Sequence, residues 1–401
     1  MSTSSADESD QGERSRPTVS WFELFYDLVV VAAVSLCNDA YLTRPSWGTA
    51  AAALLGIAAL SWVWLMTTVF NNVFPGEDLT RRLLLLAQMA CIVVAALAVD
   101  ANGLSNSTGL VAYGASILII GVAVLRERGG LKRASVVKGG LASLIVTAGI
   151  CLVGAFLPSD YAGAVLALAL TVSVGTALTA RLDTPAVGVL LRIDHLRERR
   201  GLFVLIILGE GFAQLVQALH HHGSIPRGGV FALTFMLSFA LWWIYYDGTF
   251  SERADRVLVH WRLSLLGHLT LIYGMAGTLD LLVLMTVQKE EVLGDSSLLY
   301  FGVALATAFF SFAILGLTVR GRLGAPGWVQ VISGVVVLGI GIGATPGADR
   351  SVNSIIAFAA ALVIANALFA VWVDRAAQTH GWRSTLKAVV DGEGTRDDML
   401  D

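Results

Sequence analysis

Long apolar segments recur along the sequence from residue 21 to residue 373 and dominate what the chain can fold into. Each is about 20 residues long, the length that a helix needs to cross the roughly 30 Å hydrocarbon core of a bilayer. Hydrophobic residues make up 56% of the 401 residues and charged residues only 14%, too few charges for the surface of a soluble protein. The pattern predicts an all-α polytopic membrane protein with about twelve transmembrane helices. The predicted spans are 21–40, 51–70, 82–100, 107–125, 138–157, 162–180, 201–219, 229–247, 263–287, 298–318, 326–345 and 352–373.

Charge and cysteine content exclude several other classes of protein. The formal net charge is −3, so we expect no nucleic-acid partner. The three cysteines all fall inside apolar segments, where they are typical of small buried residues and do not suggest a disulfide framework. The expected partners are the lipid bilayer and a small-molecule or lipid-like ligand. The sequence leaves the oligomeric state open.

The distribution of lysine and arginine predicts the orientation in the membrane. With the N-terminus in the cytoplasm and twelve spans, 23 of the 27 basic residues fall on the cytoplasmic side. Cytoplasmic loops of membrane proteins are enriched in basic residues. Both termini are therefore expected in the cytoplasm. The basic residues left on the other side are Arg44, Arg227, Lys289 and Arg350.

The sequence also suggests an internal repeat. An offset of 180 residues places Trp62 on Trp242 and Arg82 on Arg262, and an offset of 183 places Asp27 on Glu210. Six spans return the chain to the same side, so a 6+6 repeat would be parallel, with a pseudo-two-fold axis along the membrane normal. Chance similarity between two apolar stretches remains the alternative. The predicted division is a disordered tail (1–19), repeat 1 (20–180), a cytoplasmic linker (181–200), repeat 2 (201–375) and a tail (376–401).

Two motifs place ionisable residues in or beside the spans, where such residues are costly and usually functional or paired. Glu23 and Asp27 are four residues apart and share one helix face. Such a pair either takes up a proton or holds a basic group between its members. The second motif runs from Asp194 to Gly211 and carries Glu210 near the middle of the seventh span. His195, Glu198 and Arg199 share a face at the cytoplasmic mouth of that span.

These two motifs carry a family resemblance. Trp-Phe-Glu-Leu-Phe-Tyr-Asp-Leu-Val at residue 21, followed by His-Leu-Arg-Glu-Arg-Arg-Gly-Leu-Phe-Val-Leu-Ile-Ile-Leu-Gly-Glu at residue 195, resembles the bacterial low temperature requirement A family. Trp62, Trp64 and Asn72 in the second span fit as well, as does Asp78 with Arg81 or Arg82. The resemblance covers about residues 20–375.

The resemblance implies a bacterial inner-membrane protein, but it implies little chemistry because the family is poorly characterised. Gly211 stands where such proteins often have a serine after the Leu-Gly-Glu motif, so a hydroxyl that would bond the carboxylate is missing. The candidate site that the motif positions imply consists of Glu23, Asp27, His195, Glu198, Arg199, Glu210 and His260.

Other polar and aromatic residues extend the candidate list. Asp280 lies deep in the ninth span, and His268 in the same span is either a site residue or a hydrogen-bonded core histidine. Trp62, Trp242 and Tyr245 either line a pocket or form part of an interfacial aromatic belt. The tract His220-His221-His222 is expected to be solvated, and whether it binds metal is left open. We expect no cofactor and no metal site; the sequence has no Walker A, HExxH or CxxC motif.

Three functions are compatible with this pattern. The favoured one is a proton-coupled secondary transporter or channel for a hydrophobic or amphipathic solute, in which Asp27 and Glu210 carry the proton. The first alternative is an intramembrane enzyme that uses a buried Asp or Glu as a general acid on a lipid or isoprenoid, as in a terpenoid cyclase. The second alternative is a non-catalytic membrane stress protein.

Overall fold

The computed structural model describes most of the chain as helix. The described residues are 19–44, 46–76, 78–100, 103–104, 107–127, 134–179, 192–222, 228–249, 261–287, 295–321, 323–342 and 351–390. The helices of the first half are α1 Trp21–Thr43, α2 Trp47–Val73, α3 Leu79–Leu97, α4 Ser107–Glu127, α5 Ala134–Gly154 and α6 Ala162–Thr179. Those of the second half are α8 Ile193–His222, α9 Gly228–Thr249, α10 Trp261–Val287, α11 Asp295–Arg320, α12 Ala325–Ile342 and α13 Val352–Val390.

The twelve predicted spans correspond one for one to these helices. Ten of the described helices are long and apolar enough to cross a membrane, and the apolar stretches Gly140–Gly154 of α5 and Phe231–Asp247 of α9 are shorter. The remaining regular structure in the described ranges is a short 3-10 turn, Ser159–Tyr161, and a two-stranded hairpin of β1 Val99–Asp100 and β2 Gly103–Leu104. The prediction of an all-α polytopic membrane protein is confirmed.

Local capping explains where several helices begin. Ser20 and Ser46 each accept a hydrogen bond from the backbone N–H of the third residue of their helix, in a capping box. Asp78 does the same at the start of α3 with the N–H of Arg81, at 2.8 Å. A side-chain oxygen at this position satisfies one of the backbone N–H groups that a helix start leaves without a partner.

The two halves of the chain pack with the same order of neighbouring helices. In the first half α1 contacts α2 and α3, the helices α3 to α6 contact one another in chain order, and α2 contacts α6. In the second half α8 contacts α9 and α10, the helices α10 to α13 follow in chain order, and α9 contacts α13. The 6+6 repeat itself stays a prediction, which this correspondence supports.

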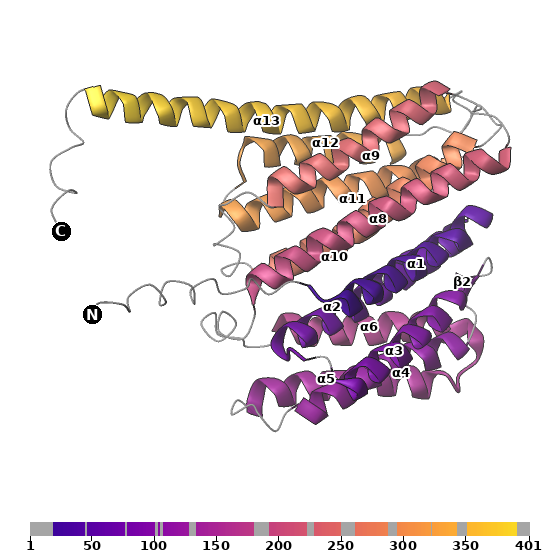
Figure 1. The fold of residues 1–401 in the computed structure, drawn as a ribbon. Coiled ribbons are helices and arrows are strands. Elements are labelled where there is room, and N and C mark those ends of the chain that lie inside the picture. Colours follow the sequence, from indigo (N-terminus) through magenta and orange to yellow (C-terminus); the bar gives the residue numbers. More distant parts are fainter. Residues whose placement is uncertain are drawn as a thin grey trace, which may run out of the picture.

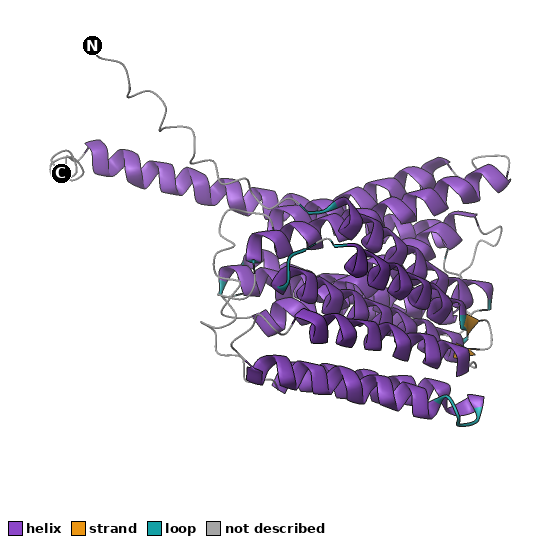
Figure 2. Ribbon diagram, turned by 60° about the horizontal axis from the view of Figure 1, so that its bottom comes forward, coloured by secondary structure: helices purple, strands orange, loops and turns teal. Residues whose placement is uncertain are grey.

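The halves lie side by side and meet mainly through four helices. Figure 1 shows the first half, coloured indigo to magenta, below the second half, and Figure 2 shows the same bundle turned by 60°. Most of the contact is made by α1 and α2 on one side and by α8 and α10 on the other, and α11 adds a hydrogen bond from Tyr300 to Asn38 of α1. Within the second half, α10 and α11 pack closely at Gly274, where an added Cβ would lie 2.5 Å from the backbone nitrogen of Ala308.

Two helices run past the predicted boundaries. α8 begins at Ile193, so residues 193–200 of the predicted linker are helical and continuous with the seventh span. α13 continues to Val390, beyond the predicted start of the tail at residue 376, and extends past the other helices (Figures 1 and 2). Hydropathy marks the apolar part of a helix, whereas backbone hydrogen bonding continues into the charged residues that flank it.

Candidate functional site

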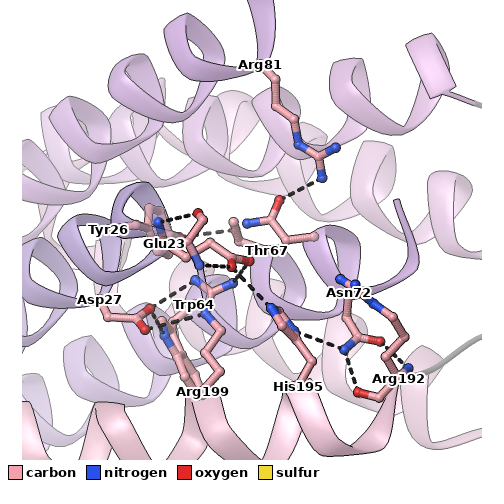
Figure 3. Close-up of polar contacts among 12 residues, drawn as sticks. Glu23, Tyr26, Asp27, Trp64, Thr67, Asn72, Arg81, Arg192, His195 and Arg199 are labelled. Carbon is pink, nitrogen blue, oxygen red and sulfur yellow. Dashed lines mark hydrogen bonds and ion pairs between the residues drawn. The ribbon is translucent and has the colours of Figure 1, made fainter. Parts of the chain in front are cut away.

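Two carboxylates of α1 meet a basic pair of α8 at the contact between the halves. We call Glu23, Asp27, His195 and Arg199 the first polar cluster (Figure 3). The exposed fraction is 0% for Asp27 and Arg199, 3% for His195 and 9% for Glu23. A buried charge is tolerated when it is paired and hydrogen-bonded. The cluster meets that condition because Arg199 lies between the two carboxylates.

The guanidinium of Arg199 uses three nitrogens for this contact. Its Nη1 donates to Oε1 of Glu23 at 2.9 Å, and its Nη2 donates to Oδ1 of Asp27 at 3.0 Å. The Nε atom donates to Oδ2 of Asp27 at 3.4 Å. The forked guanidinium suits carboxylates in this way, whereas a lysine ammonium does not. The spacing of four residues between Glu23 and Asp27 places both carboxylates on the face that receives Arg199.

An indole completes the partners of Asp27. The Nε1 atom of Trp64 on α2 donates to Oδ1 of Asp27 at 2.7 Å, and the Trp64 ring packs on Phe203 of α8 with centroids 4.1 Å apart. Asp27 therefore accepts hydrogen bonds from the indole and from the guanidinium, which both favour its ionised form. The sequence motif did not point to this role of Trp64, because the indole reaches Asp27 across 37 residues of chain.

His195 connects Glu23 to the end of α2. Its Nε2 lies 3.3 Å from Oε2 of Glu23, and its Nδ1 lies 3.4 Å from Nδ2 of Asn72. Because Nδ2 of an asparagine can only donate, this network assigns the proton of a neutral imidazole to Nε2. Asn72 also bonds both the N–H and the C=O of Arg192, at 2.8 and 2.9 Å. The start of α8 is thereby held to the last turn of α2 in the first half.

A second polar contact joins the halves near the other end of α1. We call Asn38, Asp280 and Tyr300 the second polar cluster. Asn38 donates through Nδ2 to Oδ2 of Asp280 on α10 and accepts from the hydroxyl of Tyr300 on α11 at 3.0 Å. The carboxylates of Asp39 and Glu210 interact electrostatically with Asp280. No lysine or arginine in the described ranges pairs with Asp280, which is 4% exposed.

Asp27 and Glu210, the two acids predicted to carry the proton, do not lie next to each other. Asp27 contacts Arg199, and Glu210 stands eleven residues further along α8, about 16 Å away at the rise of a helix. Glu210 is partly buried and lies 3.4 Å from Nε2 of Gln214. The structure thus places Asp27 in the first polar cluster and Glu210 near the second.

Several other predicted residues lie outside the first cluster. Glu198 is exposed, since it faces away from the side of α8 that carries His195 and Arg199. Arg82 is exposed, whereas its neighbour Arg81 is buried, donates to Asn71 at 3.0 Å and stands over the ring of Phe70. His260 and the 1–18 part of the tail lie outside the described residues, as do 181–191 and 391–401.

The predicted aromatic residues separate into two places. Trp62 is buried in the first half and donates to Oγ of Ser173 on α6 at 2.8 Å, so it holds α2 to α6. Tyr245 and His268 meet in the second half with their ring centroids 6.3 Å apart. Trp242, one turn before Tyr245, packs against Tyr246 in a tilted arrangement with the ring centroids 5.0 Å apart.

The described part of the chain contains no group of three His, Cys, Asp or Glu side chains placed to hold a metal ion. A hollow of about 20 Å³ is lined by residues that include Asp247, Arg320 and Gln330, and it lies in the second half, away from both polar clusters. Its volume is that of roughly one water molecule.

The fold and the buried charges define a multi-pass helical membrane protein with ionic contacts between two halves. The sequence matches the model of the family described as bacterial low temperature requirement A protein over residues 18–366, and the chain belongs to this family. It is also 30% identical to the uncharacterized protein RA0937 of Rhizobium meliloti (strain 1021) over 259 residues. That match covers 59% of this chain and 60% of the relative.

Proposed function

We propose that this protein is a proton-coupled secondary transporter for a hydrophobic or amphipathic solute, with a channel as the nearest variant. The observation that carries the proposal is Asp280, a buried carboxyl at the contact between the halves with no basic partner in the described ranges. Ionisable residues inside a membrane protein that lack a counter-ion mark proton or ion pathways. Transporters built from two halves bind substrate and coupling ion where the halves meet.

Asp280 is better suited to carry a proton than Asp27. Asp27 accepts hydrogen bonds from Arg199 and Trp64, and both bonds favour its ionised form. Asp280 accepts one amide hydrogen bond from Asn38 and interacts with the carboxylates of Asp39 and Glu210. Burial and like charges both favour a protonated carboxyl. We therefore assign the proton to Asp280, with Glu210 beside it. The ion pair of Asp27 with Arg199 then serves to hold the two halves together.

The two clusters suit a mechanism of alternating access. The first cluster joins α1 to α8 and the second joins α1 to α10 and α11, so each holds the two halves together near one end of α1. Protonation of Asp280 replaces a charge-assisted hydrogen bond from Asn38 by a neutral one, which is roughly half as strong. A proton would thus favour separation of the halves at the second cluster while the first stays closed.

The orientation follows from the basic residues. With the N-terminus in the cytoplasm, the first cluster faces the cytoplasmic side of the bacterial inner membrane and the second cluster faces the outer side. In this arrangement the proton reaches Asp280 from the outer side of the membrane. Proton-driven import or exchange takes its protons from that side.

A flux measurement tests the proposal. The purified protein is placed in vesicles that contain a pH-sensitive dye, a proton gradient is imposed, and alkyl sulfates, quaternary alkyl ammonium ions and prenyl alcohols are added in turn. We expect at least one of these solutes to increase proton flux, and Asp280→Asn to abolish that increase. Asp194→Asn serves as the matched control because the Asp194 side chain is 89% exposed. Failure of every solute, or equal flux in Asp280→Asn, would refute the proposal.

One observation favours an intramembrane acid catalyst as a second candidate. Tyr300 of the second cluster stacks on Tyr41 at 4.3 Å and lies edge-on to Tyr273 at 6.2 Å. A neutral carboxyl beside aromatic rings can protonate an alkene, and the rings stabilise the carbocation until a neighbouring carbon returns the proton. Conversion of a prenylated compound by wild type but not by Asp280→Asn, without proton flux, would favour this candidate.

A further inference from the structure

Arg200 is a largely buried arginine without an acidic partner in the described part of the chain. It follows Arg199 on α8 but points away from the first half, toward α10. Its Nη1 donates to Oγ of Ser264 on α10 at 2.9 Å. The same Nη1 lies 3.4 Å from Nδ1 of His268. Its Nε is buried and has no hydrogen-bond partner among the described residues. Its neighbour Arg199, in contrast, pairs with two carboxylates.

His268 leaves a second polar atom open at this place. Its Nδ1 lies 2.7 Å from the backbone oxygen of Ser264, so this nitrogen carries a proton and donates. The Nε2 atom has no partner in the described ranges, although His268 is only 6% exposed. A buried polar atom without a partner is uncommon in a native structure and calls for an explanation such as a missing ligand.

A third helix, α9, contributes aromatic side chains next to Arg200 and His268. Tyr245 of α9 packs edge-on against the His268 ring. Trp242, one helical turn earlier on α9, carries a buried indole N–H that also has no partner among the described residues. Open donors or acceptors therefore occur on α8, α9 and α10, which contact one another.

The chemistry of these groups selects an anion. A guanidinium remains charged in proteins and needs a counter-charge when it is removed from water. Arg200 and Ser264 supply donors for anionic oxygens, and Nε2 of His268 can accept a hydrogen bond from a protonated oxygen of the same group. A phosphate monoester offers both kinds of oxygen. The apolar helices and aromatic rings around the site suit an alkyl or prenyl chain.

We propose that Arg200, Ser264 and His268 bind the anionic phosphate head group of an amphipathic molecule between α8 and α10. The ligand is either a lipid of the surrounding bilayer or a free solute. In the second case the inference rests on the proposed function and names the class of the solute; in the first case it stands without it.

Two binding measurements distinguish these sources. Native mass spectrometry of the protein released from nanodiscs that contain phosphatidic acid, a lipid with a phosphate monoester head group, reports retained lipid. Isothermal titration in an uncharged detergent reports binding of an alkyl phosphate. The variants are Arg200→Gln and, as matched control on the same helix end, Arg197→Gln, whose side chain is 35% exposed. Neither measurement requires proton flux, so the proposed transport can fail while this site stands.

We expect Arg200→Gln to bind its anion at least about tenfold more weakly, as the loss of a charge-assisted hydrogen bond implies. A retained phospholipid that Arg200→Gln loses identifies a lipid site, and alkyl phosphate binding that Arg200→Gln loses identifies a solute site. Ser264→Ala removes one donor without removing a charge and provides a second variant if Arg200→Gln does not fold. Equal retention and equal affinity in wild type and the folded variants would overturn the proposal.

Discussion

At the scale of single residues, the charged groups that α1, α8 and α10 place inside the bundle divide into paired and unpaired ones. Asp27 and Arg199 are fully buried together, and their charges compensate each other. Asp280 and Arg200 have no partner of opposite charge in the described ranges. Paired groups hold the structure, whereas the unpaired ones are the candidates for binding a proton or an anion.

Arg199→Gln tests the paired groups. The change leaves the carboxylates of Glu23 and Asp27 buried without a cation, which costs about 3–5 kcal/mol. We expect a large fall in thermal stability, measured by loss of helical circular dichroism in detergent on heating. The neighbouring variant Arg197→Gln should unfold at nearly the wild-type temperature. Equal stability of the two variants would mean that Arg199 does not neutralise the carboxylates.

Trp64→Phe separates the hydrogen bond from the packing of the same side chain. Phenylalanine keeps an aromatic ring against Phe203 but removes the donor 2.7 Å from Asp27. A hydrogen bond to a charged group contributes about 1.5–3 kcal/mol. We expect a loss of unfolding free energy in this range, measured by chemical denaturation. A loss no larger in Trp64→Phe than in Trp62→Phe would show that the bond to Asp27 is not special.

At the scale of helices, the length of the apolar segments was enough to predict how many there are. Twelve helices follow from twelve segments, because a bilayer requires about 20 apolar residues for each crossing. The start of α8 at Ile193 was not predictable in this way, since Asp194 to Arg200 is a charged stretch that hydropathy excludes. The sequence identified both motifs, but not their contact, because Asp27 and Arg199 are 172 residues apart.

The sequence also did not predict which face of α8 packs against α1. His195, Glu198 and Arg199 fall within one turn and a spacing rule groups them, yet Glu198 is exposed while the other two are buried. Only the packing of α1 against α8 decides which residues meet. Trp64 was not among the candidates because no spacing rule connects it with Asp27, 37 residues earlier in the chain. Asn38 was missed because an amide carries no charge that would mark it in an apolar segment.

The start of α3 predicts a pH dependence outside the membrane. Arg126 at the end of α4 donates to both carboxylate oxygens of Asp78, at 2.9 and 2.6 Å, and lowers the pKa of Asp78 from 3.8 to about 2. Asp78 therefore stabilises the helix start above its ordinary pKa, and this contribution is lost as the pH falls from about 4 toward 2. The protection of the amides in the first turn of α3 against hydrogen exchange, relative to the intrinsic exchange rate at each pH, should fall over that range in wild type.

Asp78→Asn provides the control for this prediction. Asparagine still caps the helix but has no charge for Arg126. The protection of the same amides should then change little with pH between these limits. An identical pH dependence in the variant would assign the effect to another group.

Gly274→Ala tests the close packing of α10 on α11. The new Cβ would lie 2.5 Å from the backbone nitrogen of Ala308, and a backbone atom cannot move aside as a flexible side chain can. Overpacking of this kind typically costs about 1–3 kcal/mol. We expect a lower unfolding temperature, measured by differential scanning calorimetry. Gly316→Ala on α11, where nothing lies within 4 Å of the new Cβ, should leave that temperature nearly unchanged.

At the scale of the whole molecule, two halves with the same neighbour order touch through few helices and through polar contacts at two levels. Such an interface can open at one level and stay closed at the other, since the two clusters are separated by about three turns of α1, or roughly 16 Å. The proposed transport depends on this relative motion.

Distances between spin labels on the two halves test this claim most directly. One pair, at Leu79 and Leu263, reports on the end that carries the first cluster, and a second pair, at Trp47 and Val216, reports on the other end; all four side chains are exposed. On acidification we expect the second distance to lengthen while the first stays short or shortens, and Asp280→Asn to abolish the response. Two distances that remain unchanged at every pH, with and without an alkyl phosphate, would contradict a transporter whose halves move against each other.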